Sequence, residues 1–325
     1  MEPADIGVES LGEALQRWVG RSQTEDDVAA AGPLARLASL LDHERPPWIA
    51  GELPPLAHWL YFLPSVRQSL LDADGHAKRG DLLPPVSLPR RMWAGSRVRF
   101  LQPIPVGSTI SRRSTIAGVT AKSGRSGPMI FVTVEHRITV GGILAVVEEQ
   151  DLVYRGPVSP STAGASADGA QTAATVRAGA TPPRAAASPS TGAAPGLRSP
   201  TTRRFAPDPV TLFRFSALTF NAHRIHYDRD YAREVEGYPG LVVHGQLLAI
   251  LLLDHFLRHA GAVQVNAFAF RAQQPLFDTA PFDLCLAESD GGATLWASAA
   301  NGTRAFTASL ESRSVEPKAA SGRMT

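Results

Sequence analysis

The sequence has a single cysteine, Cys285, among its 325 residues. One cysteine excludes an intrachain disulfide framework and any zinc cluster built on cysteine ligands. Long apolar runs are missing too: the longest, LLAILLLDHFL, is interrupted by Asp254 and His255 and is too short to span a bilayer. The first residues, MEPADIGVESLGEAL, carry acids and no basic segment followed by an apolar one, so they do not form a secretory signal. We therefore expect a soluble cytoplasmic protein without a membrane partner.

A large excess of charge of one sign is also missing. The 32 basic and 30 acidic residues leave a net charge of +2, so nothing in the bulk electrostatics indicates a nucleic-acid partner, despite a pI near 8.9. Hydrophobic residues make up 44% and charged residues 19% of the chain, which is typical of a globular protein. The length is sufficient for two ordinary domains, each with its own core.

Residues 156–202 have no aromatic side chain and almost no large aliphatic one, and they consist almost entirely of Ala, Gly, Pro, Ser and Thr. Such a segment cannot bury enough apolar area to offset the entropy of ordering it, so we predict a flexible linker. It divides the chain into an N-terminal half, residues 1–155, and a C-terminal half, residues 203–318, followed by a basic tail at 319–325.

The two halves show similar patterns of helices and strands. Helical spacing at 9–20 and 26–42, with Asp26 or Asp27 as a cap for the second helix, is followed by alternating apolar and polar residues that predict an antiparallel meander up to residue 155. In the C-terminal half a helix is predicted at 245–261, with Gly261 as its C-cap, ahead of four strand-like runs. We interpret this as α+β architecture with two copies of one fold, each a long central helix wrapped by an antiparallel sheet.

The stretch TFNAHRIHYD, residues 219–228, combines two histidines three apart with an asparagine. Together with the following YPGLVVHGQLL it resembles the signature of the MaoC-like dehydratases, or R-specific enoyl-CoA hydratases. In this resemblance His226 takes the histidine position and His244–Gly245 the opening of the central helix. Asn221 stands where most members of the family have aspartate.

The N-terminal half extends this resemblance. Its segments LPPLAHWLYFLP, LLPPVSLPRRMWAGSRVRFLQPIPVGS and GRSGPMIFVTVEHRI are similar to the N-terminal domain of mesaconyl-C4-CoA hydratases, itaconyl-CoA hydratases and type 2 hydroxyacyl-thioester dehydratases. The resemblance implies a tandem, or double, hot-dog fold in which a degenerate N-terminal domain completes a catalytic C-terminal one. We expect the N-terminal half, which lacks the histidine motif, to be structural and to cover the CoA portion of the substrate.

Adding water to an α,β-unsaturated thioester requires proton transfer and donors that stabilise the enolate oxygen. His226 is the expected acid–base group, because the unperturbed pKa of histidine, about 6.5, lies near working pH. The backbone N–H of Gly245, after His244 at the predicted helix start, suits the enolate oxygen. Asn221 can orient a water molecule but cannot accept its proton, so either His226 works alone or Asp228 substitutes.

Other polar residues allow both functional and structural interpretations. His223 and Asp228 are candidate substrate-binding residues beside His226, and Arg224 is a candidate partner for a free carboxylate on the substrate. A metal site formed by His223, His226 and His244 is a minor alternative, because no carboxylate with ligand spacing accompanies them, and we expect no metal. Arg90 and Arg91, beside Trp93, either contact CoA phosphates or are surface charges. Asp254, His255 and His259 form either a solvated helix face or a dimer contact.

The sequence thus predicts a hydro-lyase that acts on an enoyl-CoA, most specifically mesaconyl-C4-CoA, giving a citramalyl-type CoA ester. The reaction implies no cofactor other than the coenzyme A of the substrate, and a homodimer is an open possibility. Two alternatives remain: the same chemistry on itaconyl-CoA or on a 3-hydroxyacyl-ACP thioester, and a non-catalytic acyl-thioester-binding module that has lost its aspartate.

Overall fold

The computed structural model describes residues 8–124, 127–156, 200–261 and 263–314. Most of the predicted linker at 156–202 and the whole predicted tail at 319–325 lie outside these ranges. No helix in the described part of the chain is long and apolar enough to cross a lipid bilayer.

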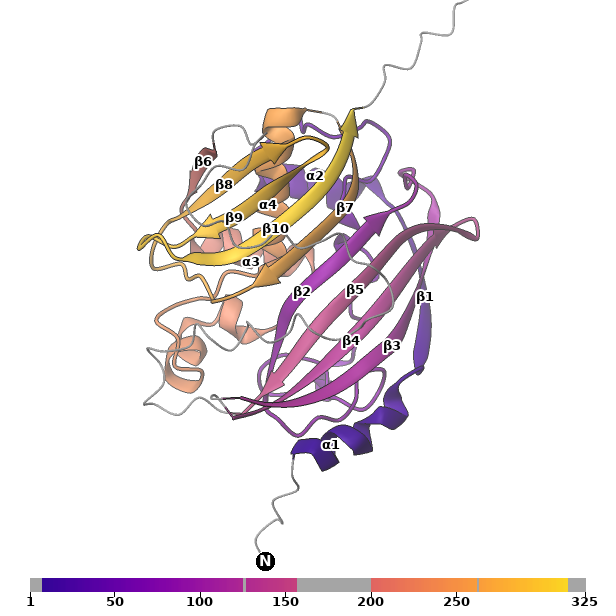
Figure 1. Ribbon diagram of the computed structural model, residues 1–325, viewed down its shortest axis with the longest axis vertical. Helices are drawn as coiled ribbons and strands as arrows, with labels where there is room; N and C mark the ends of the chain where they lie inside the picture. Colours follow the sequence, from indigo (N-terminus) through magenta and orange to yellow (C-terminus); the bar gives the residue numbers. More distant parts are fainter. Residues whose placement is uncertain (1–7, 125–126, 157–199, 262, 315–325) are drawn as a thin grey trace, which may run out of the picture.

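Within these ranges ten strands form one antiparallel sheet in the order β1-β3-β4-β5-β2-β7-β10-β9-β8-β6 (Figure 1). The strands of the N-terminal half are β1 Ser22–Val28, β2 Arg90–Phe100, β3 Thr109–Gly124, β4 Gly127–Val140 and β5 Ile143–Arg155. Those of the C-terminal half are β6 Thr201–Phe205, β7 Val263–Ala272, β8 Phe282–Ser289, β9 Gly292–Ser298 and β10 Arg304–Ser314.

The sheet consists of two copies of one strand order. Counted from the outer edges, β1-β3-β4-β5-β2 in the N-terminal half matches β6-β8-β9-β10-β7 in the C-terminal half. The halves meet where β2 pairs antiparallel with β7, for instance Ser96 opposite Phe270. Gly95 is required at this junction, because a Cβ on it would lie 2.4 Å from the carbonyl oxygen of Phe270.

The C-terminal half contains the long helix that its sequence predicts, α4 Gly245–Ala260. It packs against β7, β8, β9 and β10, and every residue from Leu247 to Leu257 is buried. The helix ends at Gly261, whose φ of 71° requires glycine and whose N–H donates to the carbonyl of Leu257 at 2.8 Å. Both the helix and its C-cap are confirmed.

The N-terminal half departs from the expectation of a long central helix in each half. Its helix between β1 and β2, α2 Ala31–Leu40, has only ten residues. Two proline pairs, at 46–47 and 54–55, prevent a helix from continuing through this segment, because proline lacks the N–H and disfavours helix in the residue before it. The predicted cap is also wrong, since Asp26 and Asp27 lie in β1 and the helix begins later.

Two shorter helices complete the framework. Helix α1, Val8–Leu15, packs on β3 and β4 of the N-terminal half. Helix α3, Pro209–Leu218, begins with Asp208 as N-cap, whose Oδ1 accepts hydrogen bonds from Val210 N at 2.8 Å and Thr211 N at 3.1 Å. Because α3 leads directly into the histidine motif, its cap helps to fix where that motif starts.

One hydrophobic core runs through both halves of the molecule. It joins Leu56, Leu60 and Ile110 of the N-terminal half to Phe215 and Phe268 of the C-terminal half, all of them almost fully buried. Because apolar side chains of both halves share this core, we expect neither half to be fully stable alone.

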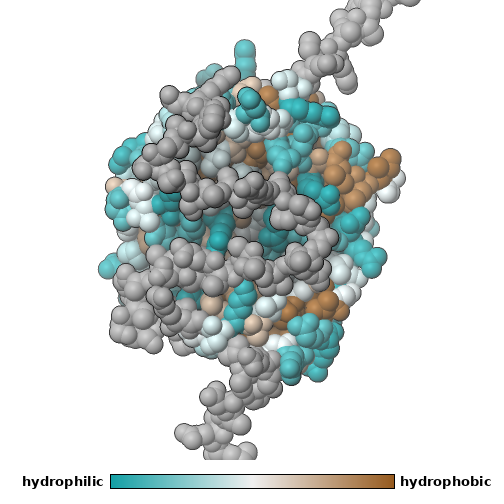
Figure 2. All heavy atoms as spheres, viewed as in Figure 1, coloured by the Kyte–Doolittle hydropathy of each residue, from teal (hydrophilic) through white to brown (hydrophobic). Residues whose placement is uncertain are grey.

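On the face shown in Figure 2, hydrophilic residues cover much of the described surface, and apolar ones gather in small patches toward one side. Exposed apolar side chains among the described residues include Ile143 and Phe220. Scattered exposure of this kind is normal for a globular protein, so the homodimer stays a prediction.

One interpretation from the sequence placed Asp254 and His255 of α4 on a solvated helix face. The structure instead buries both almost completely. The Asp254 carboxylate accepts hydrogen bonds from His43 Nε2 at 2.6 Å, Arg258 Nε at 2.8 Å and Arg203 Nη2 at 3.0 Å. A buried carboxylate with three cationic or polar donors connects α4 to β6 and to the N-terminal half.

Glu148 forms a second buried cluster, in β5 of the N-terminal half. Its carboxylate accepts hydrogen bonds from His58 Nε2 and Trp59 Nε1, both at 2.9 Å, and from Ser96 Oγ at 2.7 Å. Burial is the largest single effect and would raise the pKa of Glu148, but the hydrogen bond and charge of His58, together with His136 and Trp59, lower the pKa to about 2.

We expect Glu148→Gln to lower the free energy of unfolding by roughly 3 kcal/mol at neutral pH, because an amide satisfies three donors poorly and loses the charge. The folded-state pKa is depressed from 4.5, so this stabilisation is complete above about pH 4.5 and is lost as the pH falls toward 2. Urea unfolding at successive pH values should therefore show the gap between wild type and variant narrowing below pH 4.5. A gap that stays constant over this range would contradict the assignment.

Candidate active site

Four histidine rings form a row between the two halves of the molecule. The ring centroids of His76 and His223 are 4.0 Å apart, those of His223 and His226 5.4 Å, and those of His226 and His244 3.7 Å. His76 and His223 are half-buried, whereas His226 and His244 are buried, with 8% and 1% of their surface exposed. The row thus leads from the surface to the start of α4.

His226 lies in a single 3-10 turn, Arg224–His226, that follows α3. Its Nδ1 donates a hydrogen bond to the carbonyl oxygen of Val242 at 2.8 Å, which leaves the lone pair on Nε2. Burial lowers the pKa of His226 to about 4, although the bond to Val242 acts in the opposite direction. At neutral pH the ring is therefore neutral, with Nε2 able to accept a proton.

His244 is the N-cap residue of α4 and stacks on His226, with 17° between the ring planes. Its Nε2 shares a hydrogen bond of 2.9 Å with Ser216 Oγ, and its buried Nδ1 has no hydrogen-bond partner among the described residues. Burial lowers the pKa of His244 well below its usual value. The ring is neutral and supports His226 from the interior side.

Gly245 is the first residue of α4, so its N–H is among those that the helix itself leaves unpaired. A Cβ built on Gly245 would find no heavy atom within 4 Å beyond its chain neighbours and its own helix backbone. The helix start therefore opens onto free space next to His244. An N–H at a helix N-terminus stabilises negative charge on an approaching oxygen.

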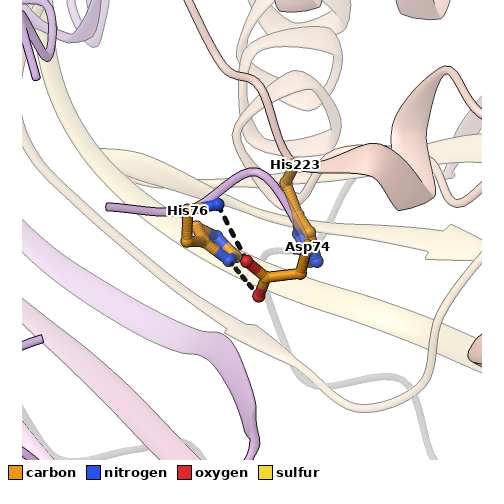
Figure 3. A group of neighbouring side chains, drawn as sticks. All are labelled: Asp74, His76 and His223. Carbon is orange, nitrogen blue, oxygen red and sulfur yellow. Dashed lines mark hydrogen bonds and ion pairs between the residues drawn. The ribbon is translucent and has the colours of Figure 1, made fainter. Parts of the chain in front are cut away.

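The N-terminal half supplies a loop to this site, shown in Figure 3 with His223 of the C-terminal half. The loop is a tight turn in which Gly75 N donates to Asp72 O at 2.9 Å and Asp72 N donates to His76 O at 2.7 Å. Gly75 has a φ of +91°, and Arg224 N donates to Asp74 O at 2.9 Å, so the turn is docked on the histidine motif.

Asp74 and His76 form a hydrogen-bonded pair within this loop (Figure 3). The carboxylate accepts from the backbone N–H of His76 and from His76 Nδ1, both at 2.8 Å. Burial would raise the pKa of Asp74, but its bonds to His76 lower it. Burial also lowers the pKa of His76, against the opposing effect of Asp74. A neutral His76 that donates from Nδ1 presents the lone pair of Nε2.

The residues expected to bind substrate are placed differently from one another. His223 lies in the row, and burial lowers its pKa. Asn221 borders the row, but its Oδ1 accepts the backbone N–H of His223 at 3.0 Å. Arg224 and Asp228 form an ion pair of 2.7 Å, and Arg224 also lies 4.1 Å from the ring centroid of Tyr231. The substrate-binding roles of Arg224 and Asp228 stay predictions, and in the structure these two side chains bind each other.

Arg90 and Arg91, expected near CoA phosphates, have different surroundings. Arg90 forms an ion pair of 2.9 Å with Glu236 and lies over the ring of Tyr238. Arg91 lies close enough to the row for its positive charge to lower the pKa of His76 and of His223. Binding of CoA phosphates by this pair stays a prediction, but the structure brings Arg91 to the acid–base groups.

Sequence reasoning missed Asp74 and His76. The available signal was the polar run DADGH, a typical turn sequence inside a proline-rich passage, but no spacing links it to residues 223–226. The expectation of a purely structural N-terminal half thus overlooked two polar groups at the site. For a divalent cation, the structure groups ligand atoms of Asp74, His76 and His223 within 4.8 Å, rather than the three histidines considered from sequence.

Comparisons with known proteins identify thioester dehydratases and hydratases as similar to this chain. A family model described as hydroxyacyl-thioester dehydratase type 2 matches residues 56–278. The chain is 44% identical over 295 residues to a mesaconyl-C(4)-CoA hydratase of Chloroflexus aurantiacus, covering 90% of this chain and 96% of that protein. It is 29% identical over 249 residues to a mitochondrial hydroxyacyl-thioester dehydratase type 2 of Schizosaccharomyces pombe, covering 73% and 78%.

Among solved structures, a Mycobacterium tuberculosis protein with a double hot-dog fold matches with a TM-score of 0.54 and 16% identity, covering 91% of this chain and 96% of that one. At this identity the likeness concerns the fold alone. Together with the repeated strand order, it confirms the predicted tandem hot-dog architecture.

Proposed function

We propose that this chain, which belongs to the hydroxyacyl-thioester dehydratase type 2 family, is a hydro-lyase that acts on an enoyl-CoA thioester. Its substrate is mesaconyl-C4-CoA, which the Chloroflexus aurantiacus relative is named for hydrating. The observation that carries the proposal is a neutral His226 whose Nδ1 is held by Val242 and whose Nε2 has no hydrogen-bond partner among the described residues, beside the open start of α4.

The residues of this site support water addition as follows. His226 Nε2 accepts a proton from water while the water oxygen bonds to the β-carbon of the substrate. The electron pair of the double bond moves to the thioester oxygen, where the Gly245 N–H stabilises the enolate. The enolate then collapses and the α-carbon takes the proton back from His226, which returns to its neutral form. The addition is redox-neutral, so we propose that no redox cofactor takes part.

Arg91 is the best candidate for binding the free carboxylate of mesaconyl-C4-CoA. Its neighbours on the site side have protein partners: Arg224 pairs with Asp228, Arg90 with Glu236, and Arg79 donates to three backbone carbonyls. Arg91 itself forms no ion pair within the described residues; its side chain interacts with the Tyr154 hydroxyl, and its charge acts on His76 and His223. A guanidinium near the acid–base groups suits a carboxylate on the β-carbon.

We expect Arg91→Ala to raise KM for mesaconyl-C4-CoA by roughly 10- to 100-fold, the usual effect of losing a charge-assisted hydrogen bond. Crotonyl-CoA has no free carboxylate, so its kcat/KM should change by less than about threefold. Arg99→Ala, on the same strand at an exposed position, serves as the matched control. Equal losses for both substrates would assign Arg91 to the CoA portion instead.

A substrate panel tests the proposed function directly. Purified protein is incubated with mesaconyl-C4-CoA, itaconyl-CoA and crotonyl-CoA, and the loss of enoyl-thioester absorbance is followed. Rapid loss with mesaconyl-C4-CoA supports the proposal. Preference for itaconyl-CoA or crotonyl-CoA reassigns the substrate, whereas tight binding without turnover of any of them indicates a non-catalytic acyl-thioester-binding module.

A further inference from the structure

A reacting water that donates to two acceptors is fixed in orientation, with an oxygen lone pair facing the β-carbon. His226 Nε2 supplies one of them. Asn221 stands where the resemblance places an aspartate, yet its carbonyl oxygen is bonded to the N–H of His223, and an amide cannot take up a proton. Asp228 is no replacement, because it is paired with Arg224 and accepts the N–H of Tyr231. The second acceptor must come from elsewhere.

We propose that the Asp74–His76 pair of the N-terminal half supplies this second acceptor, with His76 Nε2 holding the second hydrogen of the water that His226 activates. His76 contacts the reacting water, and Asp74 is a positioning residue that acts through His76. The inference rests on the proposed function and adds that the active site is shared between the two halves of the chain.

The imidazole rings of His76 and His226 form similar hydrogen bonds. In each ring Nδ1 donates to an oxygen at 2.8 Å, that of Val242 for His226 and that of Asp74 for His76. Each hydrogen bond fixes the neutral tautomer that leaves Nε2 as an acceptor. Two neutral rings whose Nε2 atoms have no hydrogen-bond partner in the described part of the chain match the two hydrogens of one water molecule.

Hydrogen bonds within the loop and to the histidine motif hold His76 in place. Asp74 uses both carboxylate oxygens on His76, one on the backbone N–H and one on Nδ1. The loop is docked on the motif by Arg224, whose N–H binds the Asp74 carbonyl and whose Nη1 binds the Ala73 carbonyl at 3.2 Å. The rings of His76 and His226 both lie near that of His223, with centroids 4.0 Å and 5.4 Å from it, and they are close enough to each other for a charge on His76 to lower the pKa of His226. A carboxylate–histidine pair of this kind orients an acid–base ring.

The proton balance of the reaction is unchanged by this addition. His226 takes one hydrogen of the water as a proton and returns it to the α-carbon, while the other hydrogen stays on the oxygen that becomes the β-hydroxyl. His76 accepts a hydrogen bond from that second hydrogen throughout, and it neither gains nor loses a proton over the cycle.

Asp74→Asn separates this role from a structural one. The asparagine oxygen can still accept the N–H of His76, but its amide donates to His76 Nδ1 and moves the ring proton to Nε2, where it repels the water hydrogen. We expect kcat to fall roughly 100-fold, with KM changed less than about threefold and with melting temperature little changed. Asp72→Asn removes the same charge from an exposed side chain of the same turn and is the matched control.

Two further measurements complete the test. NMR spectra of the imidazole nitrogens should show the proton on Nδ1 of His76 in the wild type and on Nε2 in Asp74→Asn. For the ring itself, His76→Gln places an amide oxygen near the Nε2 position, so it should retain at least about tenfold more kcat than His76→Ala. Equal rates for these two variants would overturn the inference, because a water acceptor would then be unnecessary.

Other outcomes overturn the inference in different ways. If Asp74→Asn keeps kcat within about threefold of an active wild type, the loop is only structural. If the purified protein holds a stoichiometric divalent cation that Asp74→Asn loses together with activity, Asp74, His76 and His223 are metal ligands instead. A wild type that hydrates none of the enoyl-CoA substrates overturns the proposed function and this inference together.

Discussion

His226→Ala should lower kcat for mesaconyl-C4-CoA by roughly 1,000-fold, because the group that takes the proton from water is lost. The buried ring is neutral at working pH, since its pKa is lowered to about 4, so the wild type should lose activity only as the pH falls toward 4 rather than near the usual histidine value. The measurement is a pH profile of kcat/KM for the wild type, with initial rates for the variant at neutral pH.

A buried histidine also has a structural role, and a second variant separates the two. His226→Asn keeps an N–H that can donate to the Val242 carbonyl, where Nδ1 donates in the wild type, and lacks an acceptor at the position of Nε2. It should fold like the wild type, by circular dichroism and melting temperature, and still lose roughly 1,000-fold in kcat. His259→Ala, an exposed histidine of α4, is the control. Substantial activity in His226→Asn would transfer the acid–base role to another ring of the row.

Much of the fold could be predicted because its signals are local. The buried helix α4 has a largely apolar sequence, interrupted by Asp254 and His255, and a glycine end, and strands such as β4 alternate apolar with polar residues over many positions. By contrast, β1 has the sequence SQTEDDV, which is polar except for Val28, and it is a strand only because it pairs with β3. Its strand conformation depends on a partner far along the chain, so no local pattern predicts it.

The residues of the candidate site also divide into those that a local sequence signal predicts and those that depend on contacts with a distant part of the chain. His226, His244 and Gly245 were found through a motif of two segments that lie within residues 219–248, and the structure brings them together at the start of α4. Asp74 and His76 reach the site because a turn of the N-terminal half docks across the boundary between halves, a contact that depends on tertiary structure. A turn sequence such as DADGH is common on protein surfaces, so its composition alone does not indicate a function.

Gly75→Ala should be the most damaging small substitution in the N-terminal half. A Cβ at this position would lie 1.8 Å from the carbonyl oxygen of Ala222, and the φ of +91° is itself unfavourable for alanine. Relieving the overlap requires the turn to move away from the histidine motif, which breaks the bond from Arg224 N to Asp74 O. We expect a loss of roughly 3 kcal/mol in the free energy of unfolding. Because His76 moves with the turn, kcat should also fall at least about tenfold.

Gly80→Ala distinguishes backbone strain from the steric overlap. Gly80 has a similar φ of +110°, but a Cβ there would meet nothing within 4 Å. This variant should therefore lose only about 1 kcal/mol, from strain, and keep the wild-type kcat. Equilibrium unfolding and initial rates on both variants give the comparison. If Gly75→Ala matches Gly80→Ala in both quantities, the turn does not need its close approach to Ala222. If it loses stability and activity together, contact between the two halves at this turn is a condition for catalysis.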